Sequence, residues 1–257
     1  MIIEETIQKL IELKLMAMVA MLRQWLTAPP PADTTFEEQL GMLVDREVTE
    51  RRNRLIARRL RDARLPMPAS VEDVWCDPAR GVDKSVVRSL ATCQWVRAFQ
   101  NVIAVGKTGV GKSYLGAALA HAACRQGFRA LCIRAPRLLH QLVVARADGS
   151  YAKLLDQLAR THVLVIDDFL IAPMKDTECR DLLEVLDDRY GRSSTVITTQ
   201  VPTKAWHDTI HEPLVADAIC DRLVHNAHVL SLKGESGRKK NAMNTTETTK
   251  TTEATQP

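Results

Sequence analysis

The sequence predicts an α/β fold, a parallel sheet flanked by helices, preceded by an all-helical N-terminal domain. Two observations carry this prediction. From about residue 99 to residue 240, short apolar runs alternate with stretches of helical character, an alternation typical of parallel sheets with helices on both faces. Before residue 66 the apolar residues recur at helical spacing instead. A chain of 257 residues, 46% of them apolar, is long enough for one full domain and a smaller one.

The N-terminal domain, residues 1–66, is expected to hold two helices. Three prolines at 29–31 should end the first, because proline lacks the N–H that a helix interior needs. This helix is rich in Leu and Met side chains, which predict either an ordinary core or a docking face for another subunit or a partner protein. The second helix begins near Thr35, and its apolar positions recur every four residues, at Phe36, Leu40, Val44 and Val48.

Residues 67–98 contain prolines and little periodicity, and they are interpreted as a linker. The α/β domain follows over residues 99–243. The polar, low-complexity tail, residues 244–257, is expected to be disordered. The strands expected in the α/β domain are 101–105, 130–133, 163–166 and 195–199.

Composition argues against several classes of protein. The net charge of +4 is too small to predict a nucleic-acid partner by itself. Six cysteines occur without the Cys-x-x-Cys spacing of a zinc or redox site, so they are interpreted as thiols in a reducing compartment. The apolar run from Ile2 to Leu26 is interrupted by Glu12, Lys14 and Arg23, and no targeting segment is visible. A soluble, cytoplasmic protein is expected.

A phosphate-binding loop is the first functional motif. The stretch GKTGVGKS follows the first expected strand and satisfies the pattern G-x-x-x-x-G-K-[ST]. Glycines let the backbone wrap closely and point successive N–H groups at phosphates, and the following helix adds its N-terminal dipole. A chance turn would lack this strand-and-helix context. The residues assigned to nucleotide binding are Gly106, Lys107, Thr108, Gly109, Val110, Gly111, Lys112 and Ser113.

The chemistry expected of this loop is phosphoryl transfer from ATP. Lys112 would reach the β- and γ-phosphates, and the Ser113 hydroxyl would ligate Mg²⁺. The stretch VLVIDDF places Asp167 and Asp168 at the end of an uninterrupted apolar strand, where α/β sheets bind ligands. Asp167 would hold the Mg²⁺ together with Ser113, and Asp168 would orient or deprotonate the attacking water. The alternative is a surface turn after a strand.

Two late arginines are further candidates. Phosphoryl transfer needs cationic stabilisation of the γ-phosphate, often by an arginine from a neighbouring subunit. Arg222 and Arg238 both lie late in the chain. On spacing alone, each is more typical of an ordinary surface arginine.

Four blocks together resemble the IstB-like ATP-binding proteins, the helper ATPases encoded beside the transposase in a class of bacterial insertion sequences. The blocks are FEEQLGMLVDREVTERRNRLIARRLRDARL, GKTGVGKSYLGAALAHAA, VLVIDDF and DRLVHNAHVLSLKGESGRKK. The resemblance covers most of residues 1–242, and its broader relatives are AAA+ ATPases such as the DnaC-type helicase loaders. It implies an AAA+ core with a short C-terminal helical lid and ATP-driven self-assembly on duplex DNA. It also implies that this protein is associated with the nucleoid and that it recruits or stimulates a cognate transposase.

The resemblance also assigns site residues. Gly106 to Ser113 matches the Walker A loop, and Asp167 with Asp168 matches the Walker B pair. The segment Thr198-Thr199-Gln200 matches sensor 1, with Thr199 as its hydroxyl residue. Arg222 matches an arginine finger that acts on ATP of the adjacent subunit, and Arg238 matches the sensor 2 arginine.

Three positions depart from the family pattern. Lys107 stands where proline is more usual, Thr199 replaces a commoner serine, and the Walker B pair is Asp-Asp where most AAA+ proteins have Asp-Glu. A shorter second carboxylate should position water less well. Slow ATP turnover is therefore expected, which suits a switch better than a motor.

An arginine-rich helical segment is the candidate DNA contact. Residues 51–64 hold seven arginines and one acid, and Arg51, Arg54, Arg58 and Arg61 share one helical stripe. The stripe predicts phosphate contacts, because backbone charge dominates non-specific DNA affinity. The alternative is a solvated face that pairs with Glu47 and Glu50. No motif that reads bases is present, so binding is expected to be largely independent of DNA sequence and sensitive to salt.

Three other functions remain as alternatives. A helicase loader would share the ATPase core and would bind a replicative helicase. A P-loop kinase for a small molecule would need a substrate pocket and no arginine from a second subunit. A DNA-coating scaffold would bind ATP and barely hydrolyse it.

Overall fold

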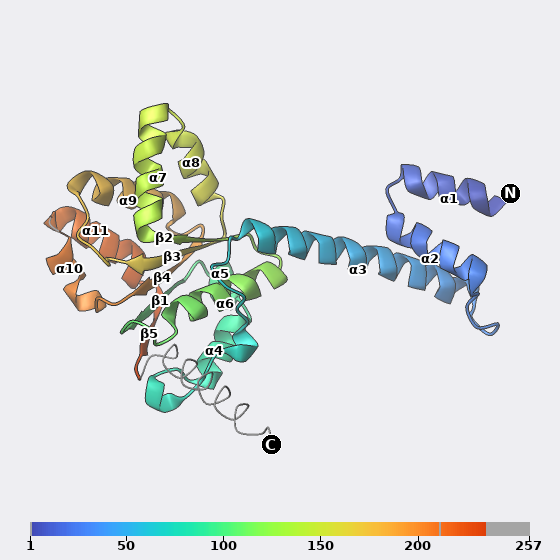
Figure 1. Ribbon diagram of the computed structural model, residues 1–257, viewed down its shortest axis with the longest axis horizontal. Helices are drawn as coiled ribbons and strands as arrows, with labels where there is room; N and C mark the ends of the chain where they lie inside the picture. Colours follow the sequence, from blue (N-terminus) through green and yellow to red (C-terminus); the bar gives the residue numbers. More distant parts are fainter. Residues whose placement is uncertain (1, 211, 235–257) are drawn as a thin grey trace, which may run out of the picture. The chain divides into compact units, whose positions relative to one another are not determined.

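The protein divides into two compact units, Met1–Arg58 and Arg59–Pro257. Figure 1 shows the computed structural model, which describes residues 2–210 and 212–234. None of the helices in these ranges is both long enough and apolar enough to cross a membrane. The two units are described separately below.

The first unit contains three helices where two were expected. They are α1 (Ile2–Glu12), α2 (Met16–Thr27) and most of α3 (Phe36–Asp62). The helix expected before the prolines is interrupted because Lys14 adopts a left-handed φ of 60°. The amides of Lys14 and Leu15 bond instead to the carbonyls of Ile11 and Leu10. The chain therefore reverses between α1 and α2, and these two helices pack against each other.

A buried carboxylate joins α2 to α3. The Glu47 side chain, on α3, accepts hydrogen bonds from the backbone amides of Ala17 (2.8 Å) and Met18 (3.3 Å) and from Arg51 Nε (2.7 Å). The amides of a first helical turn have no partner within their own helix, so Glu47 caps α2 and faces the positive end of its dipole. Burial raises the pKa of Glu47, and the hydrogen bonds from Arg51 and the two amides outweigh it, leaving the pKa below its usual range.

The start of α3 agrees with its sequence signals. Thr35 N donates to Glu38 Oε2 at 2.8 Å, and Glu38 N donates to Thr35 Oγ1 at 3.3 Å, a reciprocal capping box. The apolar positions used to predict the helix are nevertheless all exposed, because α2 covers a different side of α3 around Leu43 and Glu47. The exposed positions are Phe36, Leu40, Val44 and Val48.

The second unit is built on a five-stranded parallel sheet in the order β2-β3-β4-β1-β5. The four predicted strands are confirmed, and a fifth lies at one edge. Its sequence, AHVLSL, interrupts the apolar run with His and Ser, which an edge strand exposed on one side tolerates. The strands are β1 (Asn101–Gly106), β2 (Ala130–Arg134), β3 (Val163–Phe169), β4 (Ser194–Thr199) and β5 (Ala227–Leu232).

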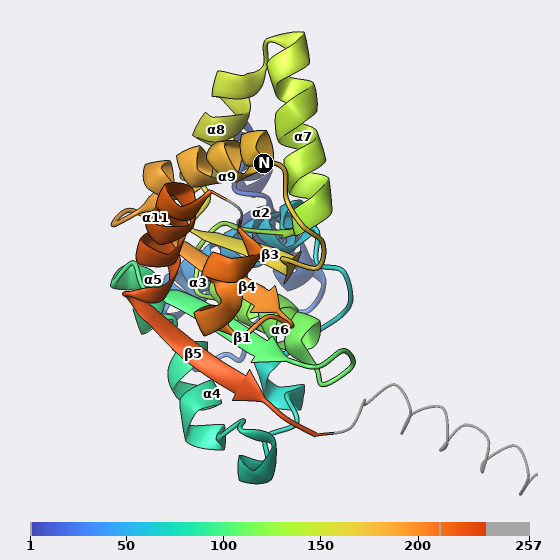
Figure 2. The same cartoon turned by 90° about the vertical axis from the view of Figure 1, so that its left-hand side faces the viewer.

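Helices cover both faces of this sheet, as Figures 1 and 2 show. In β3, Leu164 and Ile166 join one core cluster while Val163 and Val165 join the other, because successive strand residues point to opposite faces. One face carries α4 (Lys84–Ala91), α5 (Gln94–Arg97) and α6 (Lys112–Arg125). The other carries α7 (Ala135–Asp148), α8 (Tyr151–Ala159), α9 (Asp176–Arg189), α10 (Trp206–Thr209) and α11 (Pro213–Val224). Short 3-10 turns are η1 (Val71–Asp73), η2 (Pro78–Arg80) and η3 (Thr203–Ala205).

The segment expected to be a linker is part of the packed second unit. Within residues 67–98, the side chains of Val87, Leu90 and Trp95 are buried in the same core cluster as Leu115 of α6. Its helices are only eight and four residues long, too short for a helical period to stand out in the sequence. Arg59 to Asp62, at the end of α3, also belong to this unit. The expected C-terminal lid and the tail from residue 244 lie outside the described residues.

Candidate nucleotide site

The phosphate-binding loop connects β1 to α6 and has the backbone that its glycines permit. Gly109 and Gly111 have φ of 84° and 101°, a region that other residues rarely adopt. A Cβ on Gly106 would collide with the carbonyl oxygen of Leu232 in β5. The loop therefore combines a close approach of β5 with two left-handed turns before the N-terminus of α6. This is a geometry suited to wrapping phosphate oxygens.

Lys112 is held inside the loop. Its side chain is largely buried, and Nζ donates to the carbonyl oxygen of Lys107 at 2.9 Å. Burial lowers the pKa of Lys112, while the nearby charges of Asp168 and Asp167 act in the opposite direction. The side chains of Lys107 and Thr108 are exposed, so Lys107 contributes its backbone to the loop. A buried ammonium group bonded to a single neutral carbonyl is well placed to receive an anionic phosphate instead.

Asp167 collects two hydroxyl groups at one oxygen. Ser113 Oγ, in the first turn of α6, donates to Asp167 Oδ1 at 2.8 Å, and Thr198 Oγ1 donates to the same oxygen. A serine hydroxyl beside a carboxylate at the end of a phosphate-binding loop is a donor set that suits Mg²⁺, which takes few protein ligands and hard oxygens. The predicted pairing of Ser113 with Asp167 therefore fits Mg²⁺ bound to ATP.

A β-bulge re-aims the second aspartate. The register between β3 and β4 shifts between Ile166 and Phe169, and Asp168 has a φ of 57°. Bulges of this kind turn a side chain out of the regular alternation and are common beside active sites. Asp168 N donates to Thr198 Oγ1 at 3.2 Å, so the same threonine contacts both aspartates.

Arg134 is a site residue that the sequence did not reveal. It lies at the end of β2, in register with Asp167, and both Nε (2.9 Å) and Nη2 (2.7 Å) donate to Asp168 Oδ2. One oxygen of the candidate catalytic carboxylate is therefore occupied by a cation. Only the neighbouring strand order, β2 beside β3, could have indicated this pairing.

Thr198, rather than Thr199, contacts the aspartates. Successive residues of a strand point to opposite faces, and the Thr199 hydroxyl donates to the carbonyl oxygen of Phe169 and accepts from Val201 N. The structure therefore separates Thr199 from Asp167 and places Thr198 there. Both threonines are fully buried, and Thr199 shapes the turn after β4.

The segment before β1 also supports the loop. Arg80, in η2, donates from Nη2 to the carbonyl oxygen of Val110 at 2.9 Å, and its guanidinium lies 4.0 Å from the ring centroid of Trp75. Its own carbonyl accepts from Lys233 N at 2.8 Å. Arg80 thus connects the phosphate-binding loop to the segment that the sequence had assigned to a linker.

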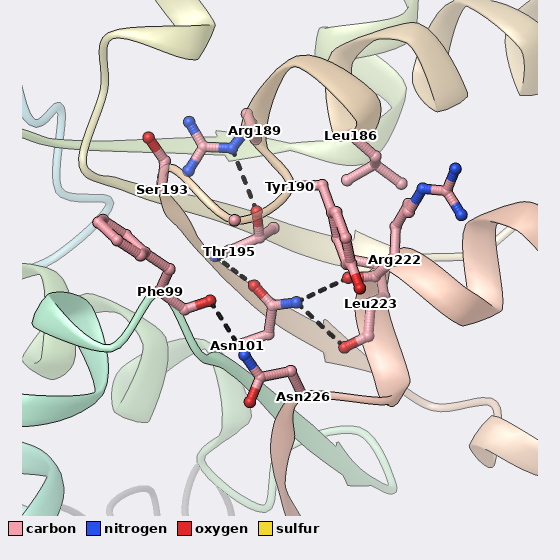
Figure 3. Close-up of a pocket in the computed structure, with 11 residues that line it drawn as sticks. Phe99, Asn101, Leu186, Arg189, Tyr190, Ser193, Thr195, Arg222, Leu223 and Asn226 are labelled. Carbon is pink, nitrogen blue, oxygen red and sulfur yellow. Dashed lines mark hydrogen bonds between the residues drawn. The ribbon is translucent and has the colours of Figure 1, made fainter.

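Arg222 lies near the N-terminal ends of the strands, whereas Lys112 follows the C-terminal end of β1. Its backbone carbonyl accepts from Asn101 Nδ2 at 2.9 Å, and Asn101 begins β1, whereas the phosphate-binding loop follows the end of β1. The Arg222 side chain bonds to Asp187 (2.8 Å) and Asp221 (2.7 Å) and lies beside the ring of Tyr190 (Figure 3). Arg222 therefore does not act on the loop of its own chain. Arg238 lies outside the described residues.

The four arginines of the predicted DNA-binding stripe fall into two pairs. Arg51 bonds to Glu47 (2.7 Å) and Arg54 bonds to Glu50 (3.0 Å), so the alternative of pairing with nearby acids holds for these two. Arg58 and Arg61 are exposed, and in the part of the chain that the structure describes neither forms an ion pair.

Substitution of the two threonines is expected to have different effects on ATP turnover. Replacing Thr198 by valine keeps its shape and removes the hydroxyl that bonds to both Asp167 and Asp168, so we expect ATP turnover to fall by about 10- to 100-fold, the scale of one lost positioning group. Thr199→Val is the matched control. It should lower the melting temperature, because Val201 N loses its acceptor, with turnover per folded molecule close to wild type. A Thr199→Val enzyme that folds normally but loses turnover would contradict this assignment.

Comparison with known structures shows the fold. The chain is similar to the crystal structure of the DnaC helicase loader, with a TM-score of 0.54 and 19% identity over 64% of this chain and 97% of that one. It is also similar to AMPPCP-bound DnaA from Aquifex aeolicus, with a TM-score of 0.57 and 14% identity over 72% of this chain and 56% of that one. The α/β unit therefore has the AAA+ fold.

Comparison with known sequences shows the family. The chain is 42% identical to the insertion sequence ATP-binding protein y4pL of Sinorhizobium fredii, over 93% of this chain and 98% of that protein. It is 40% identical to the ATP-binding protein of insertion sequence IS1162 from Pseudomonas fluorescens, over 79% of this chain and 88% of that protein. The family model described as IstB-like ATP binding protein matches residues 8–245. The chain thus belongs to the IstB-like ATP-binding protein family.

Proposed function

We propose that this protein is an ATP-dependent, DNA-binding regulator of transposition. It assembles on duplex DNA when ATP is bound, recruits or stimulates the cognate transposase, and uses ATP hydrolysis as a switch. The single observation that carries this proposal is the convergence of Lys112, Ser113, Asp167 and Asp168 at one edge of the sheet, in a chain whose relatives are named as insertion sequence ATP-binding proteins.

Each site residue has a distinct task in this proposal. Backbone amides of the loop and Lys112 bind and orient the phosphates. Ser113 and Asp167 hold Mg²⁺, which neutralises phosphate charge when bound. Asp168 positions the attacking water and accepts its proton. Thr198 fixes both aspartates by bonding to Asp167 Oδ1 and Asp168 N.

ATP turnover is expected to be slow. Arg134 occupies Asp168 Oδ2, so only Oδ1 is left to accept a proton from water. A short carboxylate that an arginine holds at one oxygen is less free to align the attacking water. Slow hydrolysis suits a protein whose ATP-bound state must persist on DNA until a partner arrives.

The first test measures assembly. Sedimentation of the purified protein with duplex DNA should give large complexes with ATP, and small species with ADP or with Lys112→Ala, because only the intact loop holds the γ-phosphate. Wild-type protein that stays small and ignores both DNA and nucleotide would overturn the proposal and return the site to small-molecule phosphoryl transfer. Assemblies that capture a replicative helicase rather than the transposase would instead indicate a helicase loader.

A second test concerns Arg134. Arg134→Ala should raise steady-state ATP turnover by roughly 3- to 10-fold, because it makes both oxygens of the Asp168 carboxylate available and lets it align with water, a general base being worth about 10²- to 10⁴-fold in all. Arg134→Lys retains a charge beside Asp168 and should remain close to wild type. Arg137→Ala, an exposed arginine on α7, is the control for net charge. A fall in turnover in Arg134→Ala would mean that Arg134 assists catalysis instead of restraining Asp168.

Arg222 is proposed to complete the site of a neighbouring subunit. It lies at the edge of the sheet opposite to its own phosphate-binding loop, so only a second copy can bring the two together. A head-to-tail interface of this kind repeats around a ring or along a filament. Asp187, Asp221 and Tyr190 hold the guanidinium at the surface.

A mixing experiment tests this arrangement. Arg222→Ala should lose roughly 10³-fold or more in turnover, and Asp168→Asn should bind ATP without hydrolysing it. Equal mixtures should recover activity, up to about a quarter of wild type for random head-to-tail contacts, because some interfaces pair an intact Asp168 with an intact Arg222. Mixtures as inactive as either variant alone would place the action of Arg222 within its own chain.

A further inference from the structure

A second basic site lies in the α/β unit, away from the nucleotide. A pocket of about 250 Å³ opens where β2 and β3 begin, so the length of the strands separates it from Lys112 and Asp167. Arg59, Arg129 and Arg160 line it, together with Asp62, Gln157 and Thr161. The volume is below the roughly 300–1,000 Å³ of typical small-molecule sites, so it suits a phosphate group better than a whole nucleotide.

Among the residues that the structure describes, two of the three arginines that line this pocket form no ion pair, and the third forms only an exposed one. Arg160 forms one ion pair, with Asp156 at 2.7 Å, and both side chains are exposed, so that pair is weak. Neither Arg59 nor Arg129 forms an ion pair within the described ranges. Asp62 is the one acid that lines the pocket.

A fourth arginine adds charge behind the pocket. Arg189 is 1% exposed, and its guanidinium donates to Thr195 Oγ1, a bond drawn in Figure 3. It also donates to the carbonyls of Leu158, Thr161 and Ser194, so all its acceptors are neutral groups. The bond to Leu158 satisfies a carbonyl in the last turn of α8. Because its acceptors are neutral, Arg189 adds its positive charge to that of Arg59 and Arg129.

Burial and the positive charges around the pocket both lower the pKa of the neighbouring His162. Burial lowers the pKa of His162, and the charges of Arg129, Arg59 and Arg189 lower it further. Its Nδ1 accepts from Arg129 N at 3.1 Å, which keeps the ring next to the pocket. Besides burial, three cations lower the pKa of this histidine although one acid, Asp62, also lines the pocket, so the positive charges prevail and an anion would be stabilised here.

We propose that this pocket binds a backbone phosphate of duplex DNA, as a contact separate from the stripe of Arg51, Arg54, Arg58 and Arg61. Arg59, Arg129 and Arg160 line the pocket. Arg59 is not part of the stripe, because its side chain is rotated about 100° around α3 from that of Arg58. Planar guanidinium groups bind phosphate oxygens in pairs. The inference rests on the proposed function only in naming DNA as the source of the phosphate.

The test is the salt dependence of DNA binding in the presence of ATP. Arg129→Ala/Arg160→Ala should weaken binding equally for unrelated duplex sequences. It should also reduce the slope of log affinity against log salt by about one, because the two arginines share one phosphate and each lost phosphate contact removes about one. Arg129→Lys/Arg160→Lys keeps the charges and should keep the slope. Arg137→Ala/Arg180→Ala, on α7 and α9 at the other end of the strands from the pocket, also removes two positive charges and controls for net charge.

The outcomes separate this inference from the proposed function. Wild-type protein that binds DNA with a steep slope, while Arg129→Ala/Arg160→Ala binds with the same slope and affinity, overturns the pocket alone. Wild-type protein that does not bind DNA overturns both. A loss in Arg54→Ala/Arg58→Ala that adds to the loss in the pocket variant, in log affinity, supports two separate contacts.

His162 supplies a local readout. A short duplex bound at the pocket should raise the pKa of His162, measured by NMR with His162→Gln for assignment, because a phosphate offsets the nearby arginines. Inorganic phosphate, at the same total concentration of phosphate groups, should raise the pKa of His162 less than the duplex does. An equal shift with both would identify a free-anion site instead, and no shift with the duplex would overturn the proposal.

Discussion

One carboxylate oxygen, Oδ1 of Asp167, organises the nucleotide site. It accepts from Ser113, in the first turn of α6, and from Thr198, in the middle of the sheet. Because these hydroxyls come from separate elements, their shared acceptor joins the helix that follows the phosphate-binding loop to β4. Asp167 lies in the last part of β3, a strand buried on both faces, which cannot shift without disturbing two packed cores. The position of Asp168, and hence of its partner Arg134, depends on this anchor and on the bulge beside it.

The phosphate-binding loop is also held from outside. Arg80 bonds to the carbonyl of Val110, lies against Trp75, and receives Lys233 N at its own carbonyl. The loop is therefore tied both to the segment before β1 and to the chain just after β5. This explains why residues 67–98 are packed: they form the outer wall of the loop and fill the face of the sheet beside α6.

The parallel sheet separates two kinds of chemistry. All five strands point the same way, so the residues of the nucleotide site gather at the C-terminal ends of the strands. Arg222 and the basic pocket lie at the N-terminal ends, a strand length away, or about 16 Å for five residues. Groups at the N-terminal ends are too far from this site to act on it. The proposed roles of Arg222 on a neighbouring subunit and of Arg129 and Arg160 on DNA both follow from this separation.

The sequence by itself determined the α/β class, four of the five strands, the glycine-rich loop after the first of them, and the place of Asp167 and Asp168 at the end of a buried apolar run. All of these depend on local signals: unbroken apolar runs, glycine spacing and residues that follow directly along the chain. Only the tertiary structure decided which threonine meets Asp167, because one residue along a strand reverses the direction of a side chain. It also revealed Arg134, Arg80 and the pocket of Arg59, Arg129 and Arg160, whose members are far apart in sequence. Strand order and packing bring these groups together, and the spacing of residues along the chain predicts neither of them.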